Sequence, residues 1–118
     1  MKKHILIYDD DPEILFLCTA ILSKYNYEAQ TFSRCDNIIA DIEKHKPDLI
    51  LMDLWIPDIG GEKTIAIVKE DKNIKTPILI FSANADIKNL TKKVNADGYI
   101  EKPFAINIFI ETIQKYIG

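Results

Sequence analysis

The chain has 118 residues and a mass of 13.5 kDa, which fits one domain of ordinary size. We therefore expect residues 1–118 to form one domain, without a separate output domain. Hydrophobic residues make up 47% of the chain, enough for a core that needs no disulfide or metal. The formal net charge of −3 offers no basic surface, so neither nucleic acid nor a membrane is an expected partner.

The amino-terminal segment shows no targeting or membrane signal. Its apolar run ends at Tyr8, before three consecutive aspartates, and is too short for a signal-peptide core or a membrane span. A cytoplasmic location is therefore predicted. Cys18 and Cys35 lack the spacing of a metal knuckle or a CxxC redox pair, and we expect both thiols to be buried or inert.

Short apolar runs alternate with segments of helical period along the chain, a pattern typical of repeated strand–helix units around a parallel sheet. Five strands are predicted, at residues 5–8, 28–32, 49–52, 78–81 and 99–100. The first, third and fourth runs are apolar without alternation, as in strands that helices cover on both faces. The predicted class is therefore α/β.

Apolar stripes at helical spacing predict a helix after each strand. The stripes are Ile14, Cys18, Ile21 and Tyr25; Ile38, Ile39 and Ile42; Ile65 and Val68; Ile87, Leu90 and Val94; and Ile106, Phe109, Ile110, Ile113 and Ile117. Asp11 before Pro12 predicts an N-cap followed by proline at the first helical position, and Asp36 is a candidate second cap. The third helix is expected after Gly60 and Gly61.

Polar residues follow four of the five predicted strands directly or closely. They are Asp9 and Asp10 after the first strand, Asp53 after the third, Ser82 after the fourth and Lys102 after the fifth. Open α/β sheets bind ligands beyond the carboxyl ends of their strands, so these are the candidate functional residues. If the first and third strands are neighbours, their carboxylates converge and repel one another unless a cation is bound.

The candidate ligands are all oxygens, with no histidine or cysteine nearby, which favours Mg²⁺ over zinc. A carboxylate beside such an ion can attack phosphorus while the ion neutralises phosphate oxygens. Asp53 is then the candidate nucleophile. Lys102 would offer a positive charge to the phosphoryl group or the carboxylate, and Ser82 a hydroxyl donor to a phosphoryl oxygen.

Four segments together resemble the response-regulator receiver domain of two-component systems. They are residues 5–12 (ILIYDDDP), 48–57 (DLILMDLWIP), 81–83 (FSA) and 98–104 (GYIEKPF), and the resemblance covers essentially the whole chain. It implies a flavodoxin-like fold, a doubly wound five-stranded parallel sheet of order 2-1-3-4-5 flanked by five helices.

The resemblance also implies a role for individual residues in metal binding and phosphorylation. Asp10 and Asp53 correspond to direct Mg²⁺ ligands, Asp9 to a ligand through water, and the backbone carbonyl of Trp55 to the third protein ligand. Mn²⁺ is an expected substitute for Mg²⁺. Asp53 corresponds to the phosphoacceptor.

The remaining family positions concern the response to phosphorylation. Ser82 and Lys102 correspond to the family's hydroxyl and lysine, and Ser82 and Tyr99 to its switch residues. Lys102 precedes Pro103, where receivers often have a cis peptide bond. When Ser82 moves towards the phosphoryl group, Tyr99 is expected to turn inward.

As a receiver, the chain is expected to accept a phosphoryl group on Asp53 from a histidine kinase or a histidine phosphotransfer protein. The reaction would require Mg²⁺ and would be followed by slow hydrolysis of the acyl phosphate. A downstream protein is expected on the face formed by the fourth helix, fifth strand and fifth helix. The chain is expected to be a monomer or a weak dimer.

Two positions and one segment length depart from the usual receiver pattern. Gly60 stands where an aspartate is usual, and Asn95 stands where glycine is common before the fifth strand. Asparagine tolerates the same left-handed conformation as glycine. The segment between Ser82 and Lys102 is short for the family, which predicts a short or mobile fourth helix.

Three other classes of protein share part of this pattern. A phosphatase of the haloacid-dehalogenase type also forms an aspartyl phosphate, and residues 9–12 contain its two aspartates but not its Thr or Val. A flavin-binding module of the same sheet order needs a phosphate loop after the first strand, where this chain has three carboxylates. A degenerate receiver that only binds partners is disfavoured by the complete set of site residues.

Ile108 lies roughly 160–200° from the inner stripe of the last helix and is predicted to be exposed. Single exposed isoleucines are common. The sharper hypothesis is that Ile108 and Phe104 contribute to a partner or dimer face.

Overall fold

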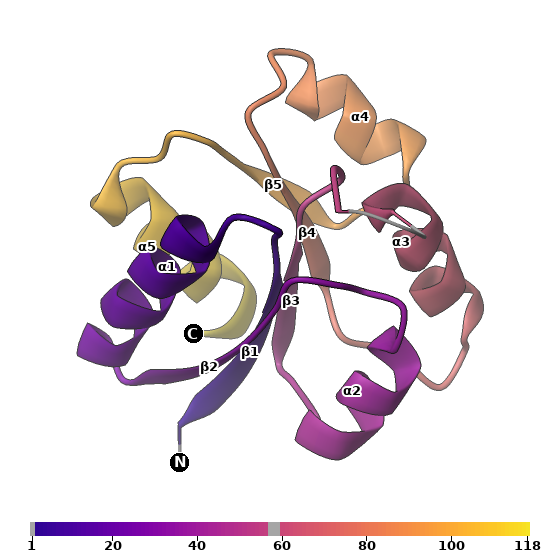
Figure 1. Cartoon of the computed structure of the whole chain (residues 1–118), viewed down its shortest axis with the longest axis horizontal. Coiled ribbons are helices and arrows are strands. Elements are labelled where there is room, and N and C mark those ends of the chain that lie inside the picture. Colours follow the sequence, from indigo (N-terminus) through magenta and orange to yellow (C-terminus); the bar gives the residue numbers. More distant parts are fainter. Residues whose placement is uncertain (1, 57–59) are drawn as a thin grey trace.

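The computed structural model describes residues 2–56 and 60–118 (Figure 1). Pro57, which ends one receiver-like segment, lies outside the described residues together with 58 and 59. Strands and helices alternate within the described part. They are β1 Lys3–Tyr8, α1 Pro12–Lys24, β2 Tyr27–Phe32, α2 Ile38–His45, β3 Leu49–Met52, α3 Gly61–Glu70, β4 Ile78–Ser82, α4 Ile87–Lys93, β5 Gly98–Glu101 and α5 Ile106–Ile117.

The strands form one parallel sheet in the order β2-β1-β3-β4-β5, which confirms the predicted topology. β1 is an inner strand of this arrangement, paired with β2 on one side and β3 on the other. Tyr8, the last residue of β1, is opposite Met52, the last residue of β3. The residues that follow these two strands therefore leave the sheet side by side.

Helices cover both faces of the sheet, with α1 and α5 on one face and α2, α3 and α4 on the other (Figure 1). Each face has its own apolar core. Ile5 and Ile7 of β1 contribute to the core under α1 and α5, whereas Leu6 and Tyr8 contribute to the core under the other three helices. This alternation explains why the central strands are apolar at every position.

Several local predictions are confirmed. The Asp11 side chain accepts a hydrogen bond from the Glu13 amide (2.9 Å) at the start of α1, with Pro12 at the first helical position. Asn95 has a left-handed backbone (φ +62°), and the peptide bond between Lys102 and Pro103 is cis. α4 is short, with seven residues.

Three sequence predictions are wrong: the helix cap at Asp36, and the places of Tyr25 and Ile106 on the inner apolar stripes of their helices. Asp36 does not cap α2; its side chain pairs with Arg34 (3.3 Å), and Asn37 holds the cap position without a side-chain bond. Tyr25 is 47% exposed because α1 ends at Lys24 and the chain turns away from the helix. Ile106 is 52% exposed because it is the first residue of α5, and helical side chains point back towards the amino terminus.

Both cysteines are buried and free. Burial raises the pKa of the Cys18 thiol to about 12, so this thiol stays protonated near neutral pH. Among the described residues, no helix combines the length and the apolar character needed to cross a membrane.

Gly61, at the start of α3, packs directly on the end of β3. A methyl group at this position would lie 2.2 Å from the carbonyl oxygen of Asp53 and 2.8 Å from the Cα of Leu54. Because both neighbours are backbone atoms, they cannot move aside without displacing the chain at Asp53 and Leu54. We expect Gly61→Ala to lower the free energy of unfolding by about 2 kcal/mol, measured by urea denaturation. The exposed neighbour provides the control, Glu62→Ala, which should unfold at the wild-type midpoint; equal midpoints for all three proteins would contradict the prediction.

Candidate functional site

Backbone hydrogen bonds hold the ends of β1 and β3 together at the carboxyl edge of the sheet. The Asp53 amide donates to the carbonyl of Tyr8 (2.9 Å), and the Asp9 amide donates to the carbonyl of Phe32 (3.0 Å). These bonds continue the ladders of the sheet by one residue. Asp9 and Asp53 are therefore placed by rigid neighbouring strands rather than by a free loop.

Three carboxylates gather at this edge. One oxygen from each of Asp9, Asp10 and Asp53 lies within 4.8 Å of the others. Asp9 and Asp53 are buried (0% and 4% exposed), whereas Asp10 is exposed. The cluster is thus open to solvent on the side of Asp10, whereas the carboxylates of Asp9 and Asp53 are shielded from solvent by the protein.

Lys102 reaches the same cluster from the loop after β5. Its Nζ lies 2.5 Å from Oδ2 of Asp9 and 3.4 Å from Oδ2 of Asp53. The backbone amide of Lys102 donates to the carbonyl of Ser82 (2.9 Å), which ties this loop to the end of β4. The ammonium also lies 4.7 Å from the centre of the Phe81 ring, at a distance suited to a cation–π contact.

The second oxygen of each buried carboxylate is held by a backbone amide. Oδ1 of Asp9 accepts from the amide of Asp11 (2.9 Å), and Oδ1 of Asp53 accepts from the amide of Trp55 (3.1 Å). Both acceptors therefore bond to the residue two positions later, and both Oδ2 atoms face Lys102. The two side chains are held in fixed orientations before any ligand binds.

Burial and charge set the ionisation of this group. Burial raises the pKa of Asp53, and the Asp9 charge adds to this, while the Trp55 amide and Lys102 act against it. For Lys102, burial would lower the pKa, but the hydrogen bond to Asp9 and the charge of Asp53 outweigh it and raise the pKa. The lysine therefore stays charged and pairs with both buried carboxylates.

The structure places the other predicted site residues at differing distances from this cluster. Ser82 is buried at the end of β4, and its hydroxyl accepts from the Asn84 amide (3.1 Å). Tyr99, in β5, is partly buried and packs against the core under α2, α3 and α4. Trp55 is 72% exposed. Ser82 is thus at the same sheet edge as the acids, whereas Tyr99 lies within its strand.

Two contacts around the site were not predicted from the sequence. Phe81 packs under the Lys102 ammonium, and the Tyr8 hydroxyl donates to Asp41 of α2 (2.8 Å). The signal for the second was present, because a tyrosine interrupts an otherwise aliphatic buried strand. Its partner could not be found from spacing, since Asp41 is 33 residues away.

The chain matches a known family over most of its length. A family model of the response regulator receiver domain matches residues 5–114. The chain belongs to the response-regulator receiver domain family. Members of this family bind Mg²⁺ at an acidic pocket and interact with histidine kinases and downstream targets.

Two curated relatives show the range of proteins that contain such a domain. The chain is 32% identical over 108 residues to the nitrogen assimilation regulatory protein NtrX of Azorhizobium caulinodans, covering 88% of this chain and 24% of that protein. It is 29% identical over 122 aligned positions to the polar-differentiation response regulator DivK of Brucella anthropi, covering 100% and 98%. The chain therefore spans about a quarter of NtrX and nearly all of DivK.

Solved structures agree with this fold. The chemotaxis protein CheY4 of Vibrio cholerae superposes with a TM-score of 0.85 at 25% identity, covering 99% of this chain and 100% of that chain. A putative response regulator from Chloroflexus aurantiacus superposes with a TM-score of 0.90 at 24% identity, with 98% of each chain covered, and supports the fold alone. The haloacid-dehalogenase alternative gains no support from these comparisons.

The donor set of the cluster fits Mg²⁺. Mg²⁺ is bound in proteins through one or two carboxylates and retained waters, and this cluster offers oxygen ligands with one exposed side. Asp9, Asp10 and Asp53 contribute three negative charges against the single ammonium of Lys102. A divalent cation would relieve this excess of negative charge.

Asp53→Asn is expected to stabilise the metal-free protein. Because burial raises the pKa of Asp53 in the folded state, its stabilising contribution is complete below the unfolded pKa and is lost as pH rises through the folded pKa. At pH 7 the charged carboxylate is therefore a net cost, which asparagine removes. In EDTA the variant should melt a few degrees higher than wild type at pH 7, and the difference should shrink below about pH 4. Thermal unfolding followed by circular dichroism measures this, and a lower melting temperature at pH 7 would contradict it.

Proposed function

We propose that this receiver is a phosphorylation switch in which Asp53 accepts a phosphoryl group from a phosphohistidine of a kinase or a phosphotransfer protein. The observation that carries the proposal is the ammonium of Lys102 between the buried carboxylates of Asp9 and Asp53. A buried carboxylate with a fixed orientation is a ready nucleophile, and the lysine is in position to pair with the charge that phosphorylation adds.

A cytoplasmic location stays a prediction.

In the transfer, an oxygen of the Asp53 carboxylate attacks phosphorus and forms a new P–O bond. The P–N bond to the donor imidazole breaks, and its electron pair stays on the ring nitrogen. The product is an acyl phosphate on Asp53 and a free histidine on the donor. Slow attack of water on this acyl phosphate would return the carboxylate and release inorganic phosphate.

Asp9, Asp10 and Asp53 are the side chains that would hold Mg²⁺, with Asp9 acting through water and the backbone carbonyl of Trp55 as a further ligand. When bound, the ion supplies positive charge that stabilises the phosphoryl oxygens, and Mn²⁺ is an expected substitute. The amide of Trp55 already donates to Oδ1 of Asp53, and this hydrogen bond helps to orient the carboxylate that would act as the nucleophile. The exposed Asp10 leaves the solvent side accessible.

Lys102 and Ser82 would bind the phosphoryl group once it is attached. Lys102 would exchange part of its contact with Asp53 for a phosphoryl oxygen while keeping its bond to Asp9. Ser82, now an acceptor for the Asn84 amide, would turn its hydroxyl proton towards another phosphoryl oxygen. This movement at the end of β4 would leave room for Tyr99 of the neighbouring strand to turn inward.

Phosphorylation by a small donor tests the proposed acceptor. Wild-type protein with acetyl phosphate and MgCl₂ should gain the mass of one phosphoryl group, and neither Asp53→Asn nor wild type in EDTA should gain it. Intact-mass spectrometry measures the gain, and the fluorescence of Trp55, the single tryptophan, should change with MgCl₂. The control is Asp48→Asn, the same substitution at the opposite end of β3, which should be labelled like wild type. Labelling that persists in Asp53→Asn would contradict the proposal.

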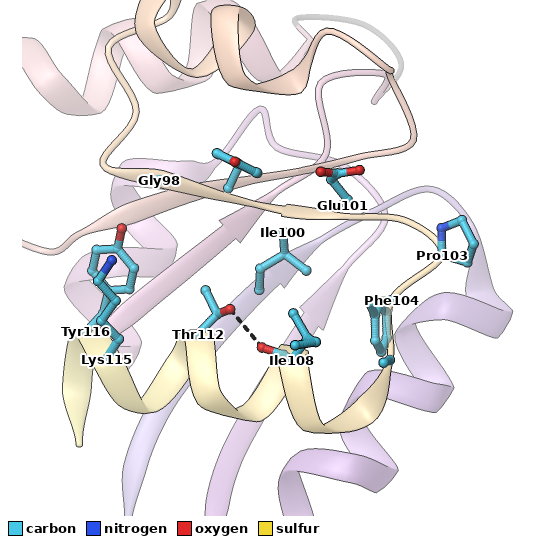
Figure 2. Close-up of a pocket in the computed structure, with 11 residues that line it drawn as sticks. Gly98, Ile100, Glu101, Pro103, Phe104, Ile108, Thr112, Lys115 and Tyr116 are labelled. Atoms are coloured by element: carbon cyan, nitrogen blue, oxygen red, sulfur yellow. Dashed lines mark hydrogen bonds between the residues drawn. The ribbon is translucent and has the colours of Figure 1, made fainter.

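The signalling face is proposed to lie on α4, β5 and α5, where the structure has a groove of about 540 Å³. Figure 2 shows this groove between β5 and α5, with Phe104 and Ile108 near one end and Lys115 and Tyr116 near the other. Ile108 is 52% exposed, as predicted. The groove adjoins Tyr99, so an inward turn of that ring would reshape its wall.

Ile108→Lys tests this face. We expect the phosphorylated wild-type chain to form a weak dimer, and the variant to dimerise at least about tenfold more weakly because it places a charge in the apolar contact. Sedimentation velocity over a range of concentrations measures this. Asn107→Lys adds the same charge next to Ile108 and outside the groove lining, and it should behave like wild type. Equal association of the two variants would exclude Ile108 from the contact, and both should still be labelled at Asp53.

A further inference from the structure

Tyr8 occupies the last position of β1, immediately before the acidic pair. Its ring is completely buried in the core under α2, α3 and α4, opposite the side of the sheet on which Phe81 lies under Lys102. The remaining core residues of β1, Ile5, Leu6 and Ile7, are aliphatic. A phenol at this position requires a hydrogen-bond partner, because a buried hydroxyl without one is costly.

The partner is Asp41, near the middle of α2. The Tyr8 hydroxyl donates to Oδ2 of Asp41 at 2.8 Å, and burial together with this carboxylate raises the pKa of Tyr8 above its usual range. Asp41 itself is only partly buried, and a hydrogen bond that a carboxylate oxygen accepts is a strong one. This bond ties α2, which contributes no residue to the acidic cluster, to the end of β1.

The backbone around Tyr8 connects this bond to both buried carboxylates. The carbonyl of Tyr8 accepts from the amide of Asp53, and Asp9 is the next residue in the chain. The amide of Asp9 donates to the carbonyl of Phe32, whose ring stacks on Tyr8 with centroids 4.9 Å apart and planes at 16°. A shift of the Tyr8 ring would therefore move the attachment points of Asp9 and Asp53 relative to each other.

We propose that the Tyr8–Asp41 hydrogen bond positions the carboxylates of Asp9 and Asp53 for a divalent cation. Tyr8 is thus a positioning residue, which acts on the site through backbone bonds and touches no ligand. This inference rests on the proposed function, because the cation is the Mg²⁺ of the phosphorylation site. Its consequence is that α2 contributes to metal affinity from outside the acidic cluster.

Tyr8→Phe tests the inference, because it keeps the ring and its stacking and removes only the hydroxyl. The Kd for Mg²⁺, from titration of Trp55 fluorescence with MgCl₂, is expected to rise at least about threefold, since the carboxylates lose part of their preorganisation. The matched control is Tyr27→Phe. Tyr27 is also buried, and its hydroxyl donates to the carbonyl of Gly118 (3.0 Å). It is the first residue of β2, however, and so lies at the end of the sheet opposite the acidic cluster. This control should lose stability and keep the wild-type Kd.

Substitutions of Asp41 separate the hydrogen bond from the charge. Asp41→Asn keeps an oxygen acceptor for the phenol and should bind Mg²⁺ within about twofold of wild type, whereas Asp41→Ala should match Tyr8→Phe. The double variant of Tyr8→Phe with Asp41→Ala should be no weaker than either single variant, because both remove the same bond.

Three results would overturn the inference: a wild-type Kd in Tyr8→Phe, an equal rise in Tyr27→Phe, or additive effects in the double variant. If wild type binds Mg²⁺ and Tyr8→Phe binds it equally well, the proposed function stands and only the inference fails. If wild type shows no response to MgCl₂ and no labelling at Asp53, the proposed function fails as well.

Discussion

The ammonium of Lys102 lies between two buried carboxylates, and the arrangement of the carboxyl edge of the sheet depends on it. Asp9 and Asp53 would repel each other in this poorly solvated place without a positive charge. Lys102 contacts both, at 2.5 Å and 3.4 Å, and its backbone is tied to the end of β4. The pairing thus connects β1, β3, β4 and the loop after β5. A change in charge on Asp53 therefore alters contacts that involve all four of these elements.

Backbone contacts elsewhere in the fold hold the group of Asp9, Asp53 and Lys102 in a fixed arrangement. The hydrogen-bond ladder of the sheet extends one residue beyond β1 and β3, so that Asp9 and Asp53 are attached to fixed backbone. Gly61 allows α3 to pack directly against the carbonyl of Asp53, where no side chain fits. The lysine compensates only part of the acidic charge, since Asp10 adds a third carboxylate on the open side. A rigid group with this excess of negative charge is suited to bind a cation and then to respond to an added phosphoryl group.

The proposed signalling face and the acidic cluster lie at different places but share structural elements. Lys102 follows β5 directly, and Phe104, which lines the groove on that face, packs on Phe81 beneath the lysine, with ring centroids 5.7 Å apart. A displacement of Lys102 would therefore change the packing of Phe104, which is two residues later in the chain and lines the groove. On the opposite face of the sheet, Tyr8 connects the same site to α2. The cluster thus has mechanical links to both helical layers.

The amino-acid sequence alone determined the order of strands and helices, the cap at Asp11, and the identity of the residues at the strand ends, because these depend on local periodicity and turn chemistry. It misjudged Asp36, Tyr25 and Ile106, whose positions depend on where each helix begins and ends by a single residue. Tertiary structure alone decided which oxygen of each aspartate faces Lys102, how deeply Asp9 and Asp53 are buried, and that Tyr8 bonds to Asp41. These features arise from contacts between residues 33 to 93 positions apart, which local spacing cannot specify because they form only when the sheet and its two helical layers are assembled.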